Sequence, residues 1–330
     1  MLGPRVGPRA ILFGGVVATL PDLDSFLPAA TVIDAATYHR GFSHSVFVQT
    51  AATPVIALLS ARLFKLQHIP KALIVLTVWL CLITHSLLDC LTTYGTQIFW
   101  PFSSVPPIAL PSVFIIDPTY TLLLLVGVLG FLFVFRKGRN RAQKFIQIFL
   151  ALSTLYLGAG ITAHYFVKSR AEANPLIANM KIHVQPTPLN IFYWQVLAVD
   201  KQFYYAGVTS LLRNCDFIEL KRYPRLASIQ DVIEVSPSVK RVEWWTNGFY
   251  SYFNNGDKLK IADLRIGFAP NFLFSYHFAK QAGNAYRAIR PERARSGLRS
   301  LESILELYKM AQIEPRQCTS SRFALQSLHR

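Results

Sequence analysis

His85 and Asp89 are a pair of residues whose types and spacing could do chemistry. They stand four positions apart, directly after an apolar run at residues 72–84 that predicts a helix. On a helix this spacing places both side chains on one face, about one turn apart. A polar group at the end of an apolar helix needs a partner, because it is poorly solvated there. A cation bound by both side chains is one such partner. A simple Asp–His hydrogen bond is the other, and this stretch alone favours neither.

Two earlier motifs carry side chains of the same kind. Pro21-Asp22-Leu23-Asp24 places two carboxylates in a turn, where they could approach a cation, although alone such a motif is more often a turn or a cap. His39 and His44 lie close together on either side of Arg40, in the segment 38–45, and Gly41 allows the backbone to turn tightly there. Ser43 is the expected cap of the next helix.

The composition indicates an α-helical multi-pass membrane bundle with an extramembrane portion. The chain of 330 residues is 52% hydrophobic and only 16% charged, which is more apolar than ordinary soluble domains. Residues 1–167 contain no Glu and only the five aspartates Asp22, Asp24, Asp34, Asp89 and Asp117. Three of these five belong to the motifs above, and we expect Asp117 to begin a helix at Pro118.

The apolar segments predict about five membrane spans within residues 1–167. They cover residues 10–20, 46–64, 72–91, 119–135 and 145–167, with a kink near Pro54 in the second. The first run is shorter than the ~20 residues of a full span. We therefore expect either that the natural start lies upstream or that this helix is re-entrant.

The basic residues predict the orientation of the bundle. They gather at the N-terminus and in the connections at 62–71 and 136–144, whereas the segment 92–118 has no Lys or Arg. The excess of Lys and Arg in cytoplasmic loops places these basic segments in the cytoplasm. The three motifs, and the C-terminal portion with them, are then expected on the opposite, extracytoplasmic face.

Residues 168–290 predict a small α+β domain outside the membrane. Strands are expected at 191–200, 203–212 and 257–268, a hairpin turn at 254–257, and a helix at 236–245 capped by Ser236. His183 and His277 have no ligand-type neighbours in sequence and are expected to be structural. Residues 291–330 predict a basic amphipathic helix, up to residue 312, and then a tail.

The net charge of +16 is explained by membrane lipids as partners. No zinc-finger spacing, RNA-binding signature or helix-turn-helix pattern accompanies it, so nucleic acid is not expected as a partner. The four cysteines contain no C-x-x-C pair and predict neither a disulfide framework nor a thiolate zinc site.

The three motifs together supply six candidate metal ligands, which are Asp22, Asp24, His39, His44, His85 and Asp89. Imidazole and carboxylate donors without thiolate favour Zn, with Mn, Fe or Ni as alternatives. A divalent ion there would lower the pKa of a bound water toward neutrality, which is the chemistry of metal-assisted hydrolysis. Asp24 is the candidate proton acceptor, and Arg40 the candidate contact for an anionic substrate such as a phosphoester.

The motifs PDLD, HRGFSHS and HSLLD, the last followed by T-x-Y-G, resemble the YdjM-like family of bacterial inner-membrane proteins. The resemblance covers roughly residues 10–120 and implies a multi-pass inner-membrane protein with a hydrolase-type metal site. The resemblance implies that the six candidate ligands belong to this site and, more loosely, that Thr92, Tyr94 and Gly95 do as well.

Two functions follow as hypotheses. The first is a membrane-embedded metal-dependent hydrolase acting on an ester, amide or phosphoester of a lipid or envelope-derived substrate. The second is a non-enzymatic regulatory or scaffold protein in which the motifs form a structural polar cluster, or one stabilised by a metal. An open coordination position beside a cleft would favour the enzyme.

Overall fold

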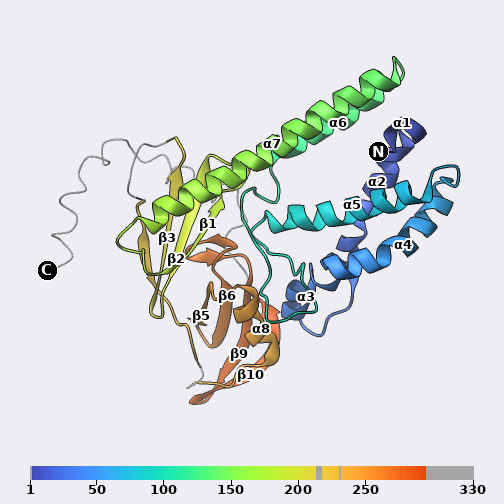
Figure 1. The fold of residues 1–330 in the computed structure, drawn as a ribbon. Helices are drawn as coiled ribbons and strands as arrows, with labels where there is room; N and C mark the ends of the chain where they lie inside the picture. Colours follow the sequence, from blue (N-terminus) through green and yellow to red (C-terminus); the bar gives the residue numbers. More distant parts are fainter. Residues whose placement is uncertain (1, 213–217, 230–231, 295–330) are drawn as a thin grey trace. The chain divides into compact units, whose positions relative to one another are not determined.

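The computed structural model describes residues 2–212, 218–229 and 232–294 and divides into two compact units. Unit 1 comprises Met1–Leu110 and Ile115–Ala159, and unit 2 comprises Pro111–Phe114 and Gly160–Arg330. Unit 1 is helical and holds all three motifs. Figure 1 colours it from blue to green along the chain.

The elements of unit 1 are short turns of helix that alternate with long apolar helices. In chain order they are α1 (Gly3–Val6), α2 (Arg9–Thr19), the 3₁₀ helix η1 (Pro21–Phe26), α3 (Val32–Tyr38), the 3₁₀ helix η2 (Phe42–His44), α4 (Val46–Leu63), α5 (Lys71–Cys90), α6 (Pro118–Phe135) and the first part of α7 (Arg139–Glu172).

Four of these helices, α4 to α7, are long and apolar enough to cross a membrane. Helix α4 continues through Pro54. The first expected span is the shorter apolar helix α2, which has 11 residues. It does not by itself reach the ~20 residues of a full span, so a count of five crossings remains a prediction.

The core of unit 1 forms where α2, α4 and α5 meet. Ile74, Val78 and Leu82 of α5 are buried, and they pack with buried side chains of α2 and α4. These residues recur every four positions, so they form one stripe along the helix. The same stripe continues into buried Ser86 and Asp89. The packing of α5 therefore also determines where its polar end points.

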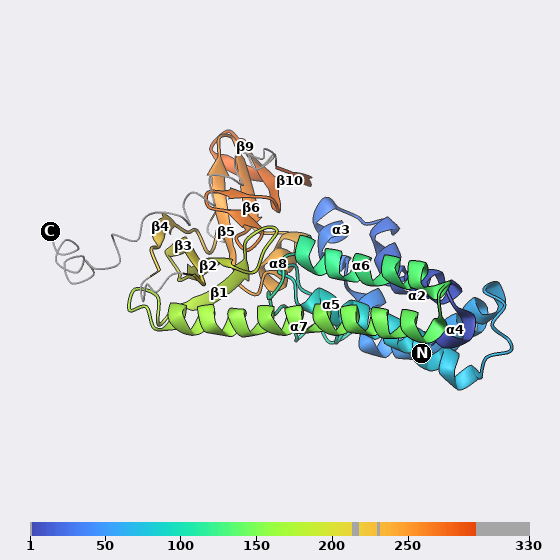
Figure 2. The same cartoon turned by 90° about the horizontal axis from the view of Figure 1, so that it is seen from above.

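Helices α6 and α7 form a hairpin (Figure 2), and two glycines of α6 lie directly against side chains of α7. A Cβ added at Gly127 would lie 2.8 Å from Cβ of Phe149, and one added at Gly130 would lie 1.9 Å from the Phe145 ring. Small residues let membrane helices approach closely. Asp117 caps α6 as predicted, because its Oδ1 accepts a 3.0 Å hydrogen bond from the Tyr120 N–H.

Unit 2 contains two four-stranded antiparallel sheets, in the orders β1-β2-β3-β4 and β10-β9-β6-β5, and a small β7–β8 ribbon. The elements are β1 (Lys181–Pro186), β2 (Tyr193–Val199), β3 (Phe203–Ser210), β4 (Lys221–Pro224), α8 (Pro237–Trp245), β5 (Tyr250–Asn255), β6 (Lys258–Asp263), β7 (Gly267–Phe268), β8 (Asn271–Phe272), β9 (Ser275–Ala282) and β10 (Ala285–Arg293).

Strand β2 is buried on both faces, so both cores of unit 2 depend on it. Trp194, Val196 and Ala198 pack in a cluster that includes the last part of α7. Leu197 and Val199 point the other way, toward residues of the second sheet. Alternate residues of a strand face opposite sides, which explains this division.

Several predicted elements of unit 2 are confirmed and others need correction. The strands at 191–200 and 203–212 and the hairpin turn at Gly256 are present, and the predicted helix is α8. Ser236 lies at the N-cap position of α8, but its side chain makes no cap hydrogen bond. The segment 257–268 is two strands, β6 and β7, because Asp263 and Arg265 form a buried ion pair at the break. Residues 291–293 belong to β10, which pairs with β9, and not to a helix. The rest of the predicted amphipathic helix and tail lies outside the described residues.

Candidate metal centre

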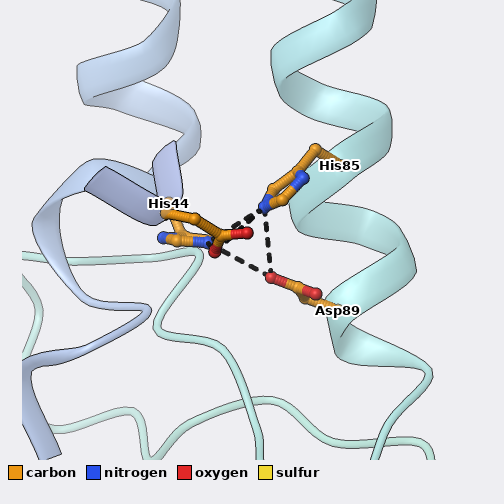
Figure 3. Close-up of side chains that lie close together, drawn as sticks. His44, His85 and Asp89 are labelled. Carbon is orange, nitrogen blue, oxygen red and sulfur yellow. Dashed lines mark hydrogen bonds and ion pairs between the residues drawn. The ribbon is translucent and has the colours of Figure 1, made fainter. Parts of the chain in front are cut away.

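Three elements of unit 1 bring the motif residues together. Helix η1 carries Asp22 and Asp24, η2 carries His44, and the last turns of α5 carry His85 and Asp89. Figure 3 shows His85 and Asp89 projecting from one helix toward His44 on the neighbouring segment. The i, i+4 spacing on α5 thus places the two side chains in one group, as the sequence predicts.

Four ligand-type atoms form a compact group: Oδ1 of Asp22, Nε2 of His44, Nε2 of His85 and Oδ2 of Asp89. All four lie within 4.8 Å of one another. Nε2 of His44 is 3.4 Å from the Asp22 oxygen and 3.2 Å from the Asp89 oxygen. Nε2 of His85 is 3.5 Å from each of these oxygens and 3.2 Å from Nε2 of His44.

These distances fit a single tetrahedral cation. Zinc binds imidazole nitrogen and carboxylate oxygen at roughly 2.0–2.2 Å, so neighbouring ligand atoms of a tetrahedron lie roughly 3.3–3.5 Å apart. Five of the six distances in the group are 3.2–3.5 Å. The group therefore has the size that one small divalent ion requires.

The hydrogen bonding of the group also fits a cation. Oδ2 of Asp89 is buried and accepts no hydrogen bond. The Nε2 atoms of His44 and His85 face each other, and two imidazole lone pairs repel unless a proton or a cation lies between them. Buried polar atoms normally have partners, so this arrangement marks a binding position.

His44 is held in the form that a metal requires. The Ser43 hydroxyl donates to Oδ2 of Asp24 at 2.5 Å, so its oxygen can accept the Nδ1–H of His44, which lies 2.9 Å away. With its proton on Nδ1, His44 presents the lone pair of Nε2 to the group. A carboxylate behind a ligating histidine is a common feature of metal sites.

Asp24 and His39 lie beside the four-atom group. Oδ1 of Asp24 lies 2.6 Å from Nδ1 of His39, and its Oδ2 accepts from the Arg40 backbone N–H at 3.0 Å. Burial would raise the pKa of Asp24, but hydrogen bonds from His39, His44 and Ser43 outweigh it and hold that pKa far below its usual value. A carboxylate held this way is a poor proton acceptor at neutral pH. Its place favours a positioning role over the predicted role of base.

Arg40 is directed inward rather than toward solvent. Its Nη2 lies 3.1 Å from Oδ1 of Asp89, and its Nη1 donates to the Thr92 hydroxyl at 3.0 Å. The side chain is buried, and the backbone has φ of +59°, a conformation that non-glycine residues seldom adopt. These contacts orient Asp89 so that its Oδ2 faces the group. They favour this role over the predicted contact with an anionic substrate.

The net charge around the group would be neutralised by one divalent ion. Three carboxylates and one guanidinium carry two net negative charges when the histidines are neutral. Burial alone would lower the pKa of His44, but the nearby carboxylates of Asp24 and Asp89 raise it. A proton can therefore occupy His44 in the absence of a cation, and metal binding would displace it.

The four ligand side chains differ in exposure. The Asp22 side chain is 50% exposed, whereas His85 is 18%, Asp89 13% and His44 0% exposed. Asp22 is therefore the ligand most accessible to solvent.

The loop after α5 holds the histidine segment in place. The Tyr94 hydroxyl donates to the Ala36 carbonyl, and Gln97 donates to the carbonyls of Thr37 and Arg40 at 2.8 and 2.9 Å. At Gly41 a Cβ would lie 2.7 Å from the Tyr38 carbonyl oxygen, so a side chain does not fit. Sequence patterns did not reveal Gln97, because a lone amide in a loop carries no spacing signal.

Ser43 differs from its predicted role. It is not the cap of α4, because Ser45 occupies that position and accepts from the Val48 N–H at 3.5 Å. Ser43 instead connects His44 to Asp24. Two serines separated by one residue are equally good caps in sequence, so only the structure distinguishes them.

Comparisons with known proteins agree with the motif resemblance. The family described as YdjM inner membrane protein matches residues 2–167, about half of the chain. Inner membrane protein YbcI of Escherichia coli (strain K12) is 35% identical over 106 residues, which cover 31% of this chain and 60% of that protein. No solved structure matches the chain.

Proposed function

Because the chain belongs to the YdjM inner membrane protein family, we propose that it is a membrane-embedded metal-dependent hydrolase. The observation that carries the proposal is the group of four ligand atoms whose spacing fits one divalent ion and of which one, on Asp22, belongs to a half-exposed side chain. Zn is the ion that the donors favour, with Mn, Fe or Ni as alternatives.

The residues around the group have distinct roles in this proposal. His44, His85, Asp22 and Asp89 would hold the ion, which would act as a Lewis acid and lower the pKa of a bound water. Ser43 and Asp24 keep His44 in its ligating form. Arg40 orients Asp89 and balances its charge.

The proposed substrate is an ester, amide or phosphoester of a lipid or envelope-derived molecule. Exposed apolar side chains lie on and beside η1, on η2 and in the loop after α5; they are Leu23, Phe26, Leu27, Phe42, Trp100 and Phe102. Phe42 contacts Trp100, with ring centroids 5.9 Å apart. Apolar and aromatic side chains in loops at the ends of membrane helices suit the lipid–water boundary. A lipid could therefore bring its polar linkage to the group.

The alternative is a structural metal site in a non-enzymatic regulatory or scaffold protein. The observation in its favour is that four protein donors alone complete a tetrahedron, as in closed structural zinc sites. The enzyme requires Asp22, the exposed ligand, to leave room for water or substrate.

Elemental analysis of the detergent-purified chain tests the proposal. We expect about one divalent ion per chain, lost in the variant His85→Ala/Asp89→Ala and retained in the control His277→Ala/Asp257→Ala, whose residues lie in unit 2. Absence of metal from well-folded wild-type protein would refute the metal centre. If metal is present, hydrolysis of ester and phosphoester lipids that stops in His85→Ala/Asp89→Ala and continues in the control variant would support the enzyme. Metal that only raises thermal stability would support the structural alternative.

We also propose that the metal centre and unit 2 lie on the extracytoplasmic side. Of the three basic segments, one begins α2, one joins α4 to α5 and one joins α6 to α7, whereas the motifs lie at the other ends of α2, α4 and α5. A reporter enzyme that works only outside the cytoplasm should be active when it is fused after Glu172 and inactive when it is fused after Gly138. The reverse result would overturn this orientation.

A further inference from the structure

A cavity of about 240 Å³ lies at the opposite end of unit 1 from the metal centre. It is formed where the N-terminal turn before α2, the connection between α4 and α5 and the connection between α6 and α7 meet. Its basic lining residues are Arg5, Arg9, Lys65, His68 and Arg139, and no carboxylate lines it.

The positive charges around this cavity have no carboxylate partner among the described residues. Every ion pair found in the described part of unit 1 uses Asp22, Asp24 or Asp89 of the metal centre. Residues 1–167 contain only two other aspartates, of which Asp34 bonds Thr31 and Asp117 caps α6. Four Lys and Arg side chains around one cavity repel each other, so a negative charge from outside the chain would stabilise them.

Apolar side chains line the cavity beside the basic ones. Phe64, Leu66 and Phe135 line it, and the Arg139 guanidinium lies 5.8 Å from the centre of the Phe135 ring. At Gly7, with φ of +61°, an added Cβ would lie 2.7 Å from that ring. The cavity is smaller than the roughly 300–1,000 Å³ of pockets that enclose whole drug-sized ligands. Its size suits a phosphate group with a small substituent.

The surroundings indicate that the phosphate belongs to a lipid. Leu63 at the end of α4 is 73% exposed, and Phe133 near the end of α6 is 77% exposed. Both stand within two residues of a cavity-lining phenylalanine, on helices apolar enough to cross a membrane. Apolar side chains toward the bilayer, followed by Lys and Arg at its surface, match a phospholipid with its acyl chains and its anionic headgroup.

We propose that this cavity binds the phosphate headgroup of an anionic phospholipid. Arg5, Arg9, Lys65 and Arg139 surround the headgroup, and exposed side chains such as Leu63 and Phe133 contact the acyl chains. The inference does not depend on the proposed hydrolase activity, since the cavity and the metal centre lie at opposite ends of unit 1.

Native mass spectrometry of the detergent-purified full chain tests the proposal, with phosphatidylglycerol and phosphatidylcholine as probes. The test variant is Arg5→Gln/Arg9→Gln/Lys65→Gln/Arg139→Gln. The matched control Arg136→Gln/Lys137→Gln/Arg141→Gln/Lys144→Gln removes as many charges from the same side of unit 1, but none of these residues lines the cavity. Circular dichroism confirms that both variants fold.

We expect the wild-type chain and the control to retain phosphatidylglycerol at least tenfold better than phosphatidylcholine. Removal of one charge from the cavity should weaken this preference by about fivefold, and removal of all four should abolish it. Equal retention of the two lipids by the wild type would overturn the proposal, as would equal losses in the two variants. Displacement of the lipid by millimolar inorganic phosphate would also overturn it, because the site would then bind the free anion. If the quadruple variant does not fold, Arg9→Gln against Lys137→Gln gives the same comparison.

Discussion

Ser43 and Asp24 determine the chemical form of His44, although neither belongs to the four-atom group. The Ser43 hydroxyl lies between the other two side chains, 2.5 Å from Asp24 and 2.9 Å from His44. It favours the neutral form of His44 in which Nδ1 carries the proton and Nε2 is free. The affinity of the centre for metal should therefore depend on a residue that never contacts the ion.

The variant Ser43→Ala tests this dependence. Loss of the hydroxyl should lower metal affinity about 10- to 100-fold, as is usual when a residue behind a ligating histidine is removed. Titration with a competing chelator measures the affinity. The control is Ser25→Ala, because the Ser25 hydroxyl donates only to the Asp22 carbonyl and is exposed. Equal affinity in the two variants would show that Ser43 does not control His44.

At the residue scale the sequence predicted which side chains lie close together. It did not predict which of them belong to the ligand group and which support it. His85 and Asp89 were predictable as a pair, because one helical turn separates them. Asp22 and Asp24 both lie in a 3₁₀ turn, where spacing does not show which one faces the histidines. The structure places Asp22 in the ligand group and Asp24 behind it. The roles of all six residues as ligands remain predictions.

Among the helices, the hairpin of α6 and α7 makes the sharpest prediction, because two glycines allow its close contact. Alanine at Gly127 and Gly130 should force Phe149 and Phe145 away and lower stability by about 1–3 kcal/mol, the usual cost of overpacking. The control is Gly158→Ala in α7, where an added Cβ meets no atom within 4 Å. Thermal unfolding in detergent measures both. A double variant that melts no lower than the control would contradict this packing.

The start of α6 and the hairpin turn at Gly256 were predictable from local signals, whereas the cap of α4 and the longer pairings were not. Asp117-Pro118 and Asn255-Gly256 fix their backbones through capping and a positive φ, which involve only neighbouring residues. The end of the 257–268 strand depends instead on the Asp263–Arg265 ion pair, buried in the fold. The alternation of polar and apolar residues in that segment does not show whether the Asp263–Arg265 pair is buried.

For the whole molecule, His183 makes the stability of unit 2 depend on pH. Burial, followed by the charge of Arg265, lowers the pKa of His183 from 6.5 to about 3. The unfolded chain therefore binds a proton in a range where the folded chain does not. This contribution to stability is complete above pH 6.5 and is lost as the pH falls toward 3, by at most about 1.4 kcal/mol per pH unit.

Urea unfolding of the full chain, followed by tryptophan fluorescence, measures this effect. Trp194 and Trp245 of unit 2 are fully buried and should report its unfolding. Between pH 6.5 and pH 4.5 the wild type should lose stability more steeply than His183→Gln, which does not titrate. Parallel pH profiles would show that another group controls the acid sensitivity.

Helix α7 has a consequence for the order in which the chain is assembled. Its 34 residues extend about 50 Å, well beyond the ~30 Å of a bilayer core. Ala163, Val167 and Ala171, near its end, pack into the same cluster as Trp194, Val196 and Ala198 of β2. The sheet thus uses the end of a membrane helix as part of its core. During synthesis α7 emerges before any strand, so the sheet can form on a surface that is already in place.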